Sequence, residues 1–291
     1  MSQTNKSVIS TPHASSDDMY EKLFLRNQGY ISDGLQQKIR STKVLIAGCG
    51  VGSTFAEAAI RMGFESLTLA DGDTVDTSNL NRQAYSYSDV GTKKVTALSK
   101  RLKAINPQAT IKEHDDWITV DNAASLVSGC DLIFDTIDFL DLVAITAVHD
   151  EANRHKKPII SAVSAGWGAA ACYFPPTDSD VCMFRKLFGL ADYGSVKNDS
   201  YVEHFSQFIG RLADELDPAV VQAMAKALTV MEDGTPCPAP HVSAGSFGVA
   251  SLAVTMAARI LNGDKVATAP NLIVANMSVI SAGEANKTIQ L

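Results

Sequence analysis

The sequence predicts an α/β protein in which a mainly parallel sheet is covered by helices on both faces. Short apolar runs alternate with helical stretches from Lys43 onward, and glycines cluster where the first run gives way to a helix. In addition, 46% of the 291 residues are hydrophobic and 20% are charged, which is enough apolar surface to bury a large core. The chain is therefore neither a disordered protein nor a short disulfide scaffold.

The first expected elements are a strand, a helix and a second strand. Residues 44–47 form a compact apolar run, and a glycine turn separates this run from an alanine-rich helical stretch at 54–62. Gly63 ends that helix, because glycine readily adopts the left-handed conformation found at helix C-termini. A second strand is expected at 66–70.

The middle of the chain continues this alternation. The stretch 94–105 places its apolar residues at three- and four-residue spacing on one face, and Pro107 follows where a helix has to end. Strands are then expected at 109–113, 132–135 and 158–163, and helices at 121–127 and 140–155. Strands that alternate with helices in this way favour parallel pairing.

The second half predicts a helical insertion and then the completion of the sheet. A strand at 166–174 is followed by Pro175 and Pro176, which mark a turn or a crossing segment. Residues 200–231 have a helical pattern in two pieces divided by Pro218, and we interpret them as a small packed insertion. A helix is expected at 243–261, and terminal antiparallel strands are expected at 271–275 and 278–281.

Charge and cysteine content exclude several classes of protein. Lys and Arg number 25 against 32 Asp and Glu, and the net charge of -7 argues against broad nucleic-acid binding, so an anionic ligand must meet a local basic pocket. Five scattered cysteines suit a reducing compartment. Residues 1–18 form a polar, flexible arm, and the apolar stretch 247–261 is shorter than the roughly 20 residues of a membrane span. We expect a cytoplasmic protein without a membrane segment.

A glycine-rich turn between the first strand and the first helix indicates a phosphate site. Gly48, Gly50 and Gly52 permit a tight turn and a close approach of the backbone, and the helix N-terminus offers free N–H groups to an anion. Close packing alone is a second explanation for these glycines, but their position favours a nucleotide. Asp71 ends the second strand, where a carboxylate can accept hydrogen bonds from ribose, as in Rossmann-like domains. To this point a dehydrogenase fits equally well.

The residues after Asp71 separate these interpretations. The segment 71–83 has no role in hydride transfer. Asn79 and Arg82 are three residues apart, so a short helix capped by Ser78 would place them on one face. An amide beside a guanidinium suits a triphosphate.

The motifs of this chain resemble those of the ThiF/MoeB/HesA superfamily, the bacterial relatives of ubiquitin-activating enzymes. The specific match is Ser-Asn-Leu-Asn-Arg-Gln at 78–83. It extends, in the same order, to Gly-Thr-Lys-Lys-Val at 91–95, Ile-Asn-Pro at 105–107, Asp-Thr-Ile-Asp at 135–138 and a glycine-started helix at 245–263. The resemblance implies a Rossmann-like domain at 19–181 that binds ATP, a crossover segment with a helical insertion at 182–242, and core-completing elements at 243–291.

The resemblance also implies the adenylation of a carboxylate with ATP and magnesium, and the release of pyrophosphate. Arg82 and Lys94 would place positive charge on the phosphates, Asp138 would bind magnesium, and Arg26 resembles an arginine that relatives extend into the neighbouring subunit of a homodimer. The expected nucleotide contacts are Gly48, Gly50, Gly52, Asp71, Asp73, Asn79, Gln83 and Asp135.

Several of these residues have a second interpretation. Arg82 and Lys94 would be solvated cations if the motifs did not contain them. Lys93 is an alternative phosphate ligand beside Lys94, although the position before Val95 favours Lys94. Asp135 would be orienting rather than metal-binding, and Arg26 would equally fit a surface position.

The cysteines depart from the family pattern. Relatives often hold a structural zinc with two Cys-x-x-Cys pairs, whereas Cys182 has lost its partner here, so we expect no structural zinc. Cys237 precedes the late helix, where some relatives hold a reactive thiol, and a spectator thiol is an equal alternative. His241 is interpreted as a structural histidine.

Three functions remain open from the sequence. The first is ATP- and magnesium-dependent adenylation, with a ubiquitin-like protein, a peptide terminus or a small acid as the acceptor; a tRNA acceptor is disfavoured by the negative charge. The second is an NAD-dependent oxidoreductase, which leaves Asn79, Arg82, Lys94 and Asp138 without a purpose. The third is a scaffold that binds ATP without turnover.

Overall fold

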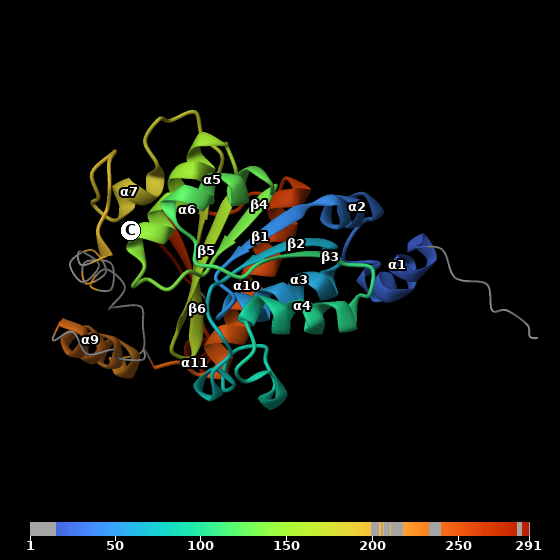
Figure 1. Ribbon diagram of the computed structural model, residues 1–291, viewed down its shortest axis with the longest axis horizontal. Coiled ribbons are helices and arrows are strands. Elements are labelled where there is room, and N and C mark those ends of the chain that lie inside the picture. The colour runs from blue at the N-terminus through green and yellow to red at the C-terminus, as the bar shows by residue number, and fades with distance from the viewer. Residues whose placement is uncertain are drawn as a thin grey trace, which may run out of the picture.

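The computed structural model describes residues 16–198, 218–232, 240–283 and 287–290, with three single residues between 204 and 210. In this part of the chain eight strands form one sheet, in the order β3-β2-β1-β4-β5-β6-β7-β8 (Figure 1). The strands are β1 (Lys43–Ala47), β2 (Ser66–Ala70), β3 (Thr110–His114), β4 (Leu132–Asp135), β5 (Ile159–Ala165), β6 (Gly168–Phe174), β7 (Asn271–Asn276) and β8 (Lys287–Gln290). The first five are parallel and have the Rossmann-like order 3-2-1-4-5, whereas β6, β7 and β8 are antiparallel. The expected fold class is confirmed.

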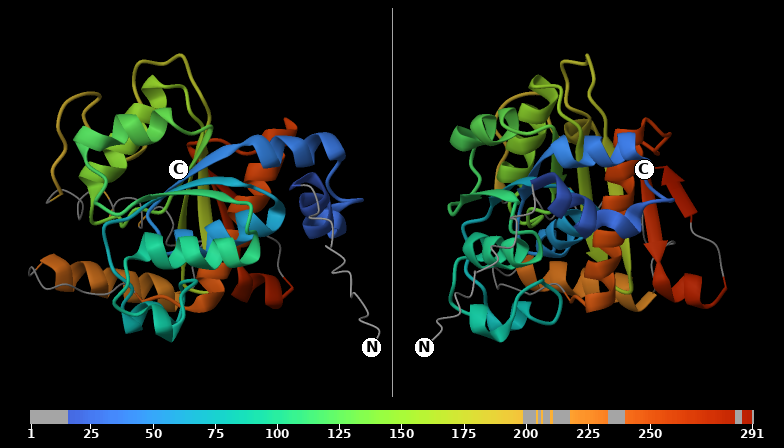
Figure 2. Two further views of the ribbon diagram at one scale, coloured as in Figure 1. Left: turned by 45° about the vertical axis from the view of Figure 1, so that its right-hand side comes forward. Right: turned by 90° about the vertical axis from the view of Figure 1, so that its right-hand side faces the viewer.

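Helices cover both faces of this sheet (Figures 1 and 2). One hydrophobic cluster joins the sheet to α2, α3, α4 and α10, and a second joins its other face to α5, α6, α7 and α9. The helices are α1 (Ser16–Phe24), α2 (Asp33–Ser41), α3 (Gly52–Met62), α4 (Lys94–Ile105), α5 (Val120–Ser128), α6 (Leu142–Arg154), α7 (Met183–Leu187), α9 (Pro218–Glu232), α10 (Ser243–Asn262) and α11 (Met277–Ser281), with 3-10 turns η1 (Leu25–Asn27), η2 (Thr77–Asn79) and η3 (Tyr87–Asp89).

Strand β1 lies at the centre of the parallel part, which explains its largely apolar sequence. Ile46 pairs with Leu69 of β2 and with Phe134 of β4, and all three side chains are buried. Phe55 of α3 stacks on Phe134 with ring centroids 3.8 Å apart. Because helices cover both faces, the strand shows a continuous hydrophobic run after Lys43 instead of alternation.

Helix α10 is a core helix. Its 20 residues are long and apolar enough to cross a membrane by length and composition, and half of this apolar window is buried inside the protein. The helix packs against α3, β5 and β6. A Cβ on Gly245 would lie 2.7 Å from the carbonyl oxygen of Gly166, so the absence of a side chain lets the helix approach the end of β5 closely.

Two expectations about the chain ends need correction. Residues 278–281 are not a strand but form most of α11, because the Asn276 side chain accepts hydrogen bonds from the N–H groups of Ser278 and Val279 and caps a single helical turn. The last three residues of the expected arm belong to α1, which is held by buried Tyr20 and Phe24. Residues 1–15 and the first expected piece of the insertion, apart from three single residues, lie outside the described residues.

Candidate nucleotide site

The predicted site residues gather at the carboxyl ends of the parallel strands. The glycine turn follows β1, Asp71 follows β2 and Asp138 follows β4. Open α/β sheets bind ligands at this edge, where β1 and β4 are neighbours and the helices that follow them, α3 and α6, lie on opposite faces of the sheet. One edge of the sheet therefore brings together residues that are far apart in sequence.

The glycines of the turn have different roles. Gly48 has a φ of +88°, and a Cβ there would lie 2.6 Å from the Thr136 carbonyl oxygen. A Cβ on Gly52 would lie 2.6 Å from Thr136 Oγ1. Gly50 faces only the Gln83 amide, at 3.4 Å. Gly48 and Gly52 thus allow the loop after β4 to pack on the turn, and Gly50 leaves room in front of the α3 N-terminus, which has no side-chain cap at Val51.

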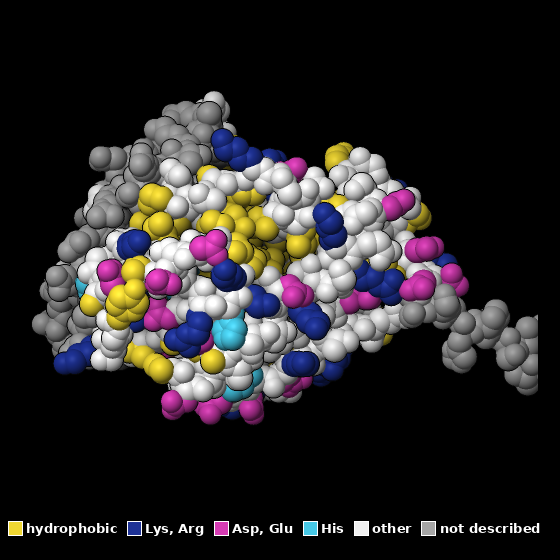
Figure 3. Space-filling model, turned by 90° about the horizontal axis from the view of Figure 1, so that it is seen from above, with side chains coloured by type: hydrophobic (Ala, Val, Ile, Leu, Met, Phe, Trp, Pro, Cys, Tyr) yellow, Lys and Arg dark blue, Asp and Glu magenta, His cyan; other side chains and the backbone are white. Residues whose placement is uncertain are grey.

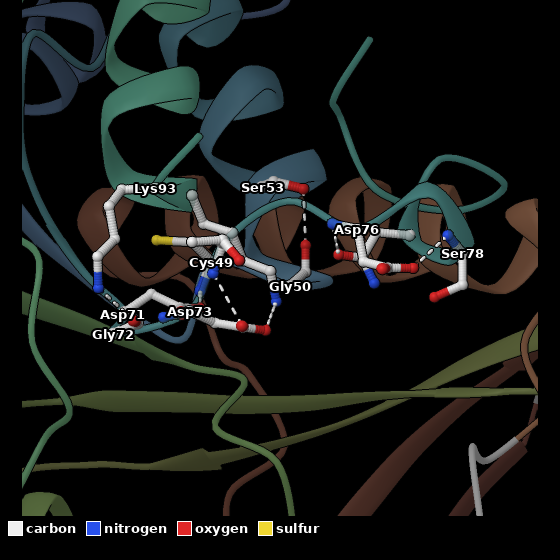
Figure 4. A network of polar contacts seen from close by, with 12 residues as sticks. Cys49, Gly50, Ser53, Asp71, Gly72, Asp73, Asp76, Ser78 and Lys93 are labelled. Carbon is white, nitrogen blue, oxygen red and sulfur yellow. Dashed lines mark hydrogen bonds and ion pairs between the residues drawn. The ribbon is translucent and has the colours of Figure 1, made fainter. Parts of the chain in front are cut away.

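The Asp71 carboxylate braces this turn (Figure 4). Its Oδ2 accepts a hydrogen bond from the Cys49 N–H at 2.7 Å, and its Oδ1 accepts one from the Asp73 N–H at 2.8 Å. A carboxylate offers about four acceptor positions, so both oxygens retain capacity for ribose hydroxyls. Asp71 therefore fits a nucleotide and also fixes the loop that receives it.

The two adjacent lysines point to different partners. Lys94 is 8% exposed, and its Nζ lies 2.7 Å from Asp73 Oδ2 in an ion pair. Lys93 instead donates to the carbonyl oxygens of Gly72, at 2.7 Å, and Asp115, at 3.2 Å (Figure 4). Lys93 joins two loops through their backbone, whereas Lys94 keeps two further ammonium protons for an anion.

The opposite charges of Arg82 and Asp138 interact. Burial lowers the pKa of the Arg82 guanidinium, and the Asp138 carboxylate acts against this lowering. Arg82 Nη1 donates to the Ser78 carbonyl oxygen at 2.9 Å and to Asn81 Oδ1 at 3.0 Å, which fixes the guanidinium on its own turn. Asp138 is exposed and accepts a hydrogen bond from the Leu140 N–H at 3.1 Å.

Asn79 and Gln83 flank Arg82. Asn79 Oδ1 accepts a hydrogen bond from the Asp76 N–H and completes a capping box, so this side chain also shapes the turn. Gln83 is buried, and its Oε1 has no hydrogen-bond partner among the described residues. An unpaired buried oxygen is costly, and a bound ligand that donates a hydrogen bond would satisfy it.

Both carboxylate oxygens of Asp135 have hydrogen-bond partners inside the protein. The residue is buried; its Oδ2 lies 2.8 Å from Ser161 Oγ and 3.1 Å from His149 Nε2. Burial lowers the pKa of His149, but hydrogen bonds with Asp135 and Cys182 outweigh burial and raise it to about 9. Sequence reasoning missed His149, because a lone histidine on an apolar helix face has no motif.

Arg26 and Cys237 are not brought into this site within the described chain. Arg26 is exposed in η1, next to Asn27, whose Nδ2 donates to the Met62 carbonyl oxygen at the C-terminus of α3. The glycine turn is at the other end of that helix, about 16 Å away along its axis. Cys237 lies outside the described residues.

Two further residues lie near the site, and sequence reasoning missed the first of them. Trp117 is 57% exposed, and a Cβ on Gly72 would lie 2.8 Å from its indole ring, so the ring rests on the residue after Asp71. His241 lies against Asn81, whose Nδ2 donates to the His241 carbonyl oxygen at 3.1 Å. Burial first, and then the Arg82 charge, lower the pKa of His241 to about 4. Trp117 was hidden because no motif contains it.

Comparison with protein families decides the family of this chain. The ThiF family model matches residues 24–287, which is most of the sequence. The chain belongs to the ThiF family. This ThiF family chain is 36% identical over 119 residues to the tRNA threonylcarbamoyladenosine dehydratase of Escherichia coli (strain K12). The alignment covers 40% of this chain and 44% of the relative. It is also 35% identical over 129 residues to the adenylyltransferase and sulfurtransferase uba4 of Pyricularia oryzae, in an alignment that covers 44% of this chain and 26% of the relative.

Solved structures share the fold of this ThiF family chain over nearly its whole length. The crystal structure of PaaA matches with a TM-score of 0.67 at 17% identity and covers 98% of this chain and 86% of PaaA. Escherichia coli MccB with ATP matches with a TM-score of 0.63 at 18% identity, over 94% of this chain and 70% of MccB. The sequence alignments, in contrast, span about a quarter to a half of the curated relatives.

Proposed function

We propose that this protein is an ATP-dependent adenylyltransferase that activates a carboxylate. The observation that carries the proposal is a pair of charge interactions: the Asp71 and Lys94 charges both act on Cys49 of the glycine turn, and the Arg82 guanidinium interacts with the exposed Asp138 carboxylate. A hydride-transfer site has no use for two cations and an acid at this point. Uba4 is named an adenylyltransferase and MccB was crystallised with ATP, which supports the same chemistry.

In the proposed reaction an oxygen of the acceptor carboxylate attacks the α-phosphorus of ATP. The new P–O bond forms acyl-AMP, and the bond between the α-phosphorus and the bridging oxygen breaks to release pyrophosphate. Negative charge grows on the departing pyrophosphate, so fixed cations stabilise the transition state more than the ground state. Arg82 and Lys94 supply these cations, and Asp71 holds the ribose end.

The donor set also fits magnesium. Mg²⁺ in nucleotide sites is held by one or two carboxylates together with phosphate oxygens and water. Asp138 offers one exposed carboxylate, and among the described residues no three His, Cys, Asp or Glu side chains form a cage of their own. Bound there with ATP, the ion would neutralise phosphate charge, while Asp138 would orient it.

Exchange of labelled pyrophosphate into ATP tests the proposed activity. We expect magnesium-dependent exchange once a suitable carboxylate is supplied, and Asp138→Asn lowers it at least tenfold because the metal loses its carboxylate. Thermal stabilisation by NAD and not by ATP would contradict the proposal and indicate an oxidoreductase. ATP binding without exchange across a broad panel of carboxylates would indicate the scaffold.

The acceptor we propose is a carboxylate at the end of a peptide or of a ubiquitin-like protein. MccB was crystallised with MccA, whereas one relative is named for a modified adenosine of tRNA. The net charge of -7, and the Lys and Arg side chains mixed with Asp and Glu on the face shown in Figure 3, favour the peptide-like class. Exchange stimulated by tRNA and not by peptide carboxylates would contradict this choice.

A further transfer to a thiol is proposed for Cys237. Burial raises the pKa of Cys130 and of Cys172 to about 12, which leaves these thiols unreactive at neutral pH. If Cys237 accepts the acyl group, Cys237→Ala keeps pyrophosphate exchange but abolishes a thioester that hydroxylamine cleaves. An unchanged thioester in this variant would exclude the role. We also propose that the enzyme acts in the cytoplasm as a homodimer.

A further inference from the structure

Behind the site lies a buried polar cluster that the proposed chemistry does not use. His149 of α6 is 1% exposed, with its ring stacked on Phe184 at a centroid distance of 4.3 Å and edge-on to Phe174 at 4.8 Å. Its Nε2 lies 3.1 Å from both Asp135 Oδ2 and Ser161 Oγ. The cluster thus joins α6, β4 and β5 in the protein interior.

The Asp135 carboxylate connects this cluster to the loop that carries Asp138. Oδ1 of Asp135 accepts a hydrogen bond from the Ile137 N–H at 3.1 Å, while Oδ2 receives His149 and Ser161. The same loop is tied to the glycine turn, since Thr136 Oγ1 donates to the Gly48 carbonyl oxygen at 2.9 Å. The backbone path from Asp135 to Asp138 is therefore fixed at its first two residues.

The charge of Asp135 requires this support. A carboxylate removed from water is stable only when it is paired or fully hydrogen-bonded, and removal of one partner leaves an uncompensated charge. His149 and Ser161 are the side chains that approach Oδ2 among the described residues. If His149 is lost, Oδ2 of Asp135 loses one of its two partners and the carboxylate is freer to rotate, which weakens its hold on Ile137.

We propose that His149 is a positioning residue: by holding Asp135 it fixes the 136–141 loop and so places Asp138 for the metal bound with the nucleotide. The inference rests on the metal role of Asp138 under the proposed function. His149 itself touches neither nucleotide nor acceptor, and it acts through one carboxylate and one backbone N–H group.

The test uses variants that separate hydrogen bonding from packing. His149→Phe keeps an aromatic ring between Phe174 and Phe184 but removes the donor. His149→Gln keeps a donor and is the conservative variant, and Ser161→Ala removes the other donor to Asp135. His155→Gln is the matched control, because His155 is more exposed and follows the last turn of the same helix, next to Glu151.

The first measurement is the Kd of a non-hydrolysable ATP analogue, by calorimetry, with magnesium and with EDTA. We expect His149→Phe to raise the Kd in magnesium about tenfold, the size of effect typical for residues that orient metal ligands, and to change the Kd in EDTA less than about twofold. Most of the loss returns in His149→Gln, Ser161→Ala is intermediate, and His155→Gln matches the wild type. An equal rise of Kd in magnesium and in EDTA would overturn the proposal.

A double-mutant cycle tests the route through Asp135. Asp135→Asn weakens magnesium-dependent binding, and adding His149→Phe to it causes little further loss if both residues act in one chain of contacts. Independent, additive losses would overturn the proposal.

Amide hydrogen exchange examines the loop without any ligand. Exchange across residues 136–141 becomes faster in His149→Phe and not in His155→Gln, and unchanged exchange would refute the positioning role. This measurement also separates the two proposals. Wild-type protein without pyrophosphate exchange, but with a loop loosened by His149→Phe, would contradict the adenylyltransferase and leave the positioning of the loop standing.

Discussion

Lys93 and Lys94 are neighbours in sequence, yet their side chains have different tasks. The Lys93 ammonium bonds two backbone carbonyl oxygens, whereas that of Lys94 is nearly buried against Asp73 at the site. The difference arises because Lys93 precedes α4 and Lys94 is its first residue, so successive side chains leave the chain in different directions. At the scale of single residues, the start of the helix decides which ammonium bonds the backbone and which pairs with Asp73.

This difference predicts contrasting effects of removing each ammonium. Lys94→Met keeps the apolar stem but removes the positive charge that is proposed to stabilise negative charge on the phosphates. We therefore expect kcat for pyrophosphate exchange to fall by about 10² to 10³, or roughly 3–4 kcal/mol of transition-state stabilisation. Lys93→Met lowers exchange less than about tenfold and instead costs about 1 kcal/mol of stability. Steady-state exchange and urea unfolding of both variants measure this, and equal kcat losses would contradict it.

His149 predicts how stability depends on pH. Its pKa is raised in the folded protein from 6.5 to about 9, so its contribution to the free energy of unfolding is complete below pH 6.5 and disappears as pH rises through 9. Asp135 and Cys182 are the titratable groups that face it. A tenfold change in proton affinity corresponds to about 1.4 kcal/mol, so we expect the loss to be between roughly 1 and 3 kcal/mol. Urea unfolding at pH 6.5 and pH 9.5 measures the difference, and His149→Phe should abolish this part of it.

At the scale of elements, the glycine turn packs the end of β1 against the end of β4. Gly48 and Gly52 are pressed against Thr136, and Tyr85 donates from its hydroxyl to the Cys49 carbonyl oxygen at 2.8 Å. The packing interpretation therefore applies to Gly48 and Gly52, whereas the phosphate interpretation stays a prediction for Gly50. Of the three glycines, only Gly50 has ordinary space around it.

Alanine at the three glycines should separate packing from binding. Gly48→Ala and Gly52→Ala each cost about 1–3 kcal/mol of stability, because the new methyl group overlaps Thr136 and, at Gly48, the positive φ is strained. Gly50→Ala changes stability by less than about 0.5 kcal/mol but weakens ATP binding, because its methyl group lies before the α3 N-terminus. Urea unfolding and ATP calorimetry report the two effects, and a destabilised Gly50→Ala protein would contradict this division.

At the scale of the whole molecule, Arg26 lies far from the glycine turn of its own chain. Within one chain it lies at the end of α3 opposite the glycine turn. We therefore propose that it acts at the ATP site of a neighbouring subunit. A homodimer with a two-fold axis would give each site one Arg26 from the partner.

Mixing two inactive variants tests this arrangement. Arg26→Ala and Asp138→Asn each fail alone, but a mixed dimer contains one site with Asp138 and the partner's intact arginine. Random exchange of subunits then restores about a quarter of wild-type pyrophosphate exchange. Activity of Arg26→Ala alone at the wild-type level would show that Arg26 is an ordinary surface residue.

Local pattern was sufficient for most of the fold. Apolar runs and their alternation with helical stretches predicted the positions of β1 to β7 to within a few residues, because strands buried on both faces must be apolar along most of their length. The exception was the segment 278–281, where an apolar pair between serines also fits a short strand. Only the side-chain cap from Asn276 shows that it is helical.

Local features of the sequence were enough to predict the family and the parallel sheet, which are confirmed, and to propose the chemical groups of the site, because motif residues and apolar periods lie close together along the chain. The partner of each side chain became evident only from the folded protein: Lys94 pairs with Asp73, Arg82 interacts with Asp138, and Asp135 turns inward to His149. The physical reason is that burial and pairing depend on strands brought together from 43 to 165, and spacing along the chain does not record which side chain meets which.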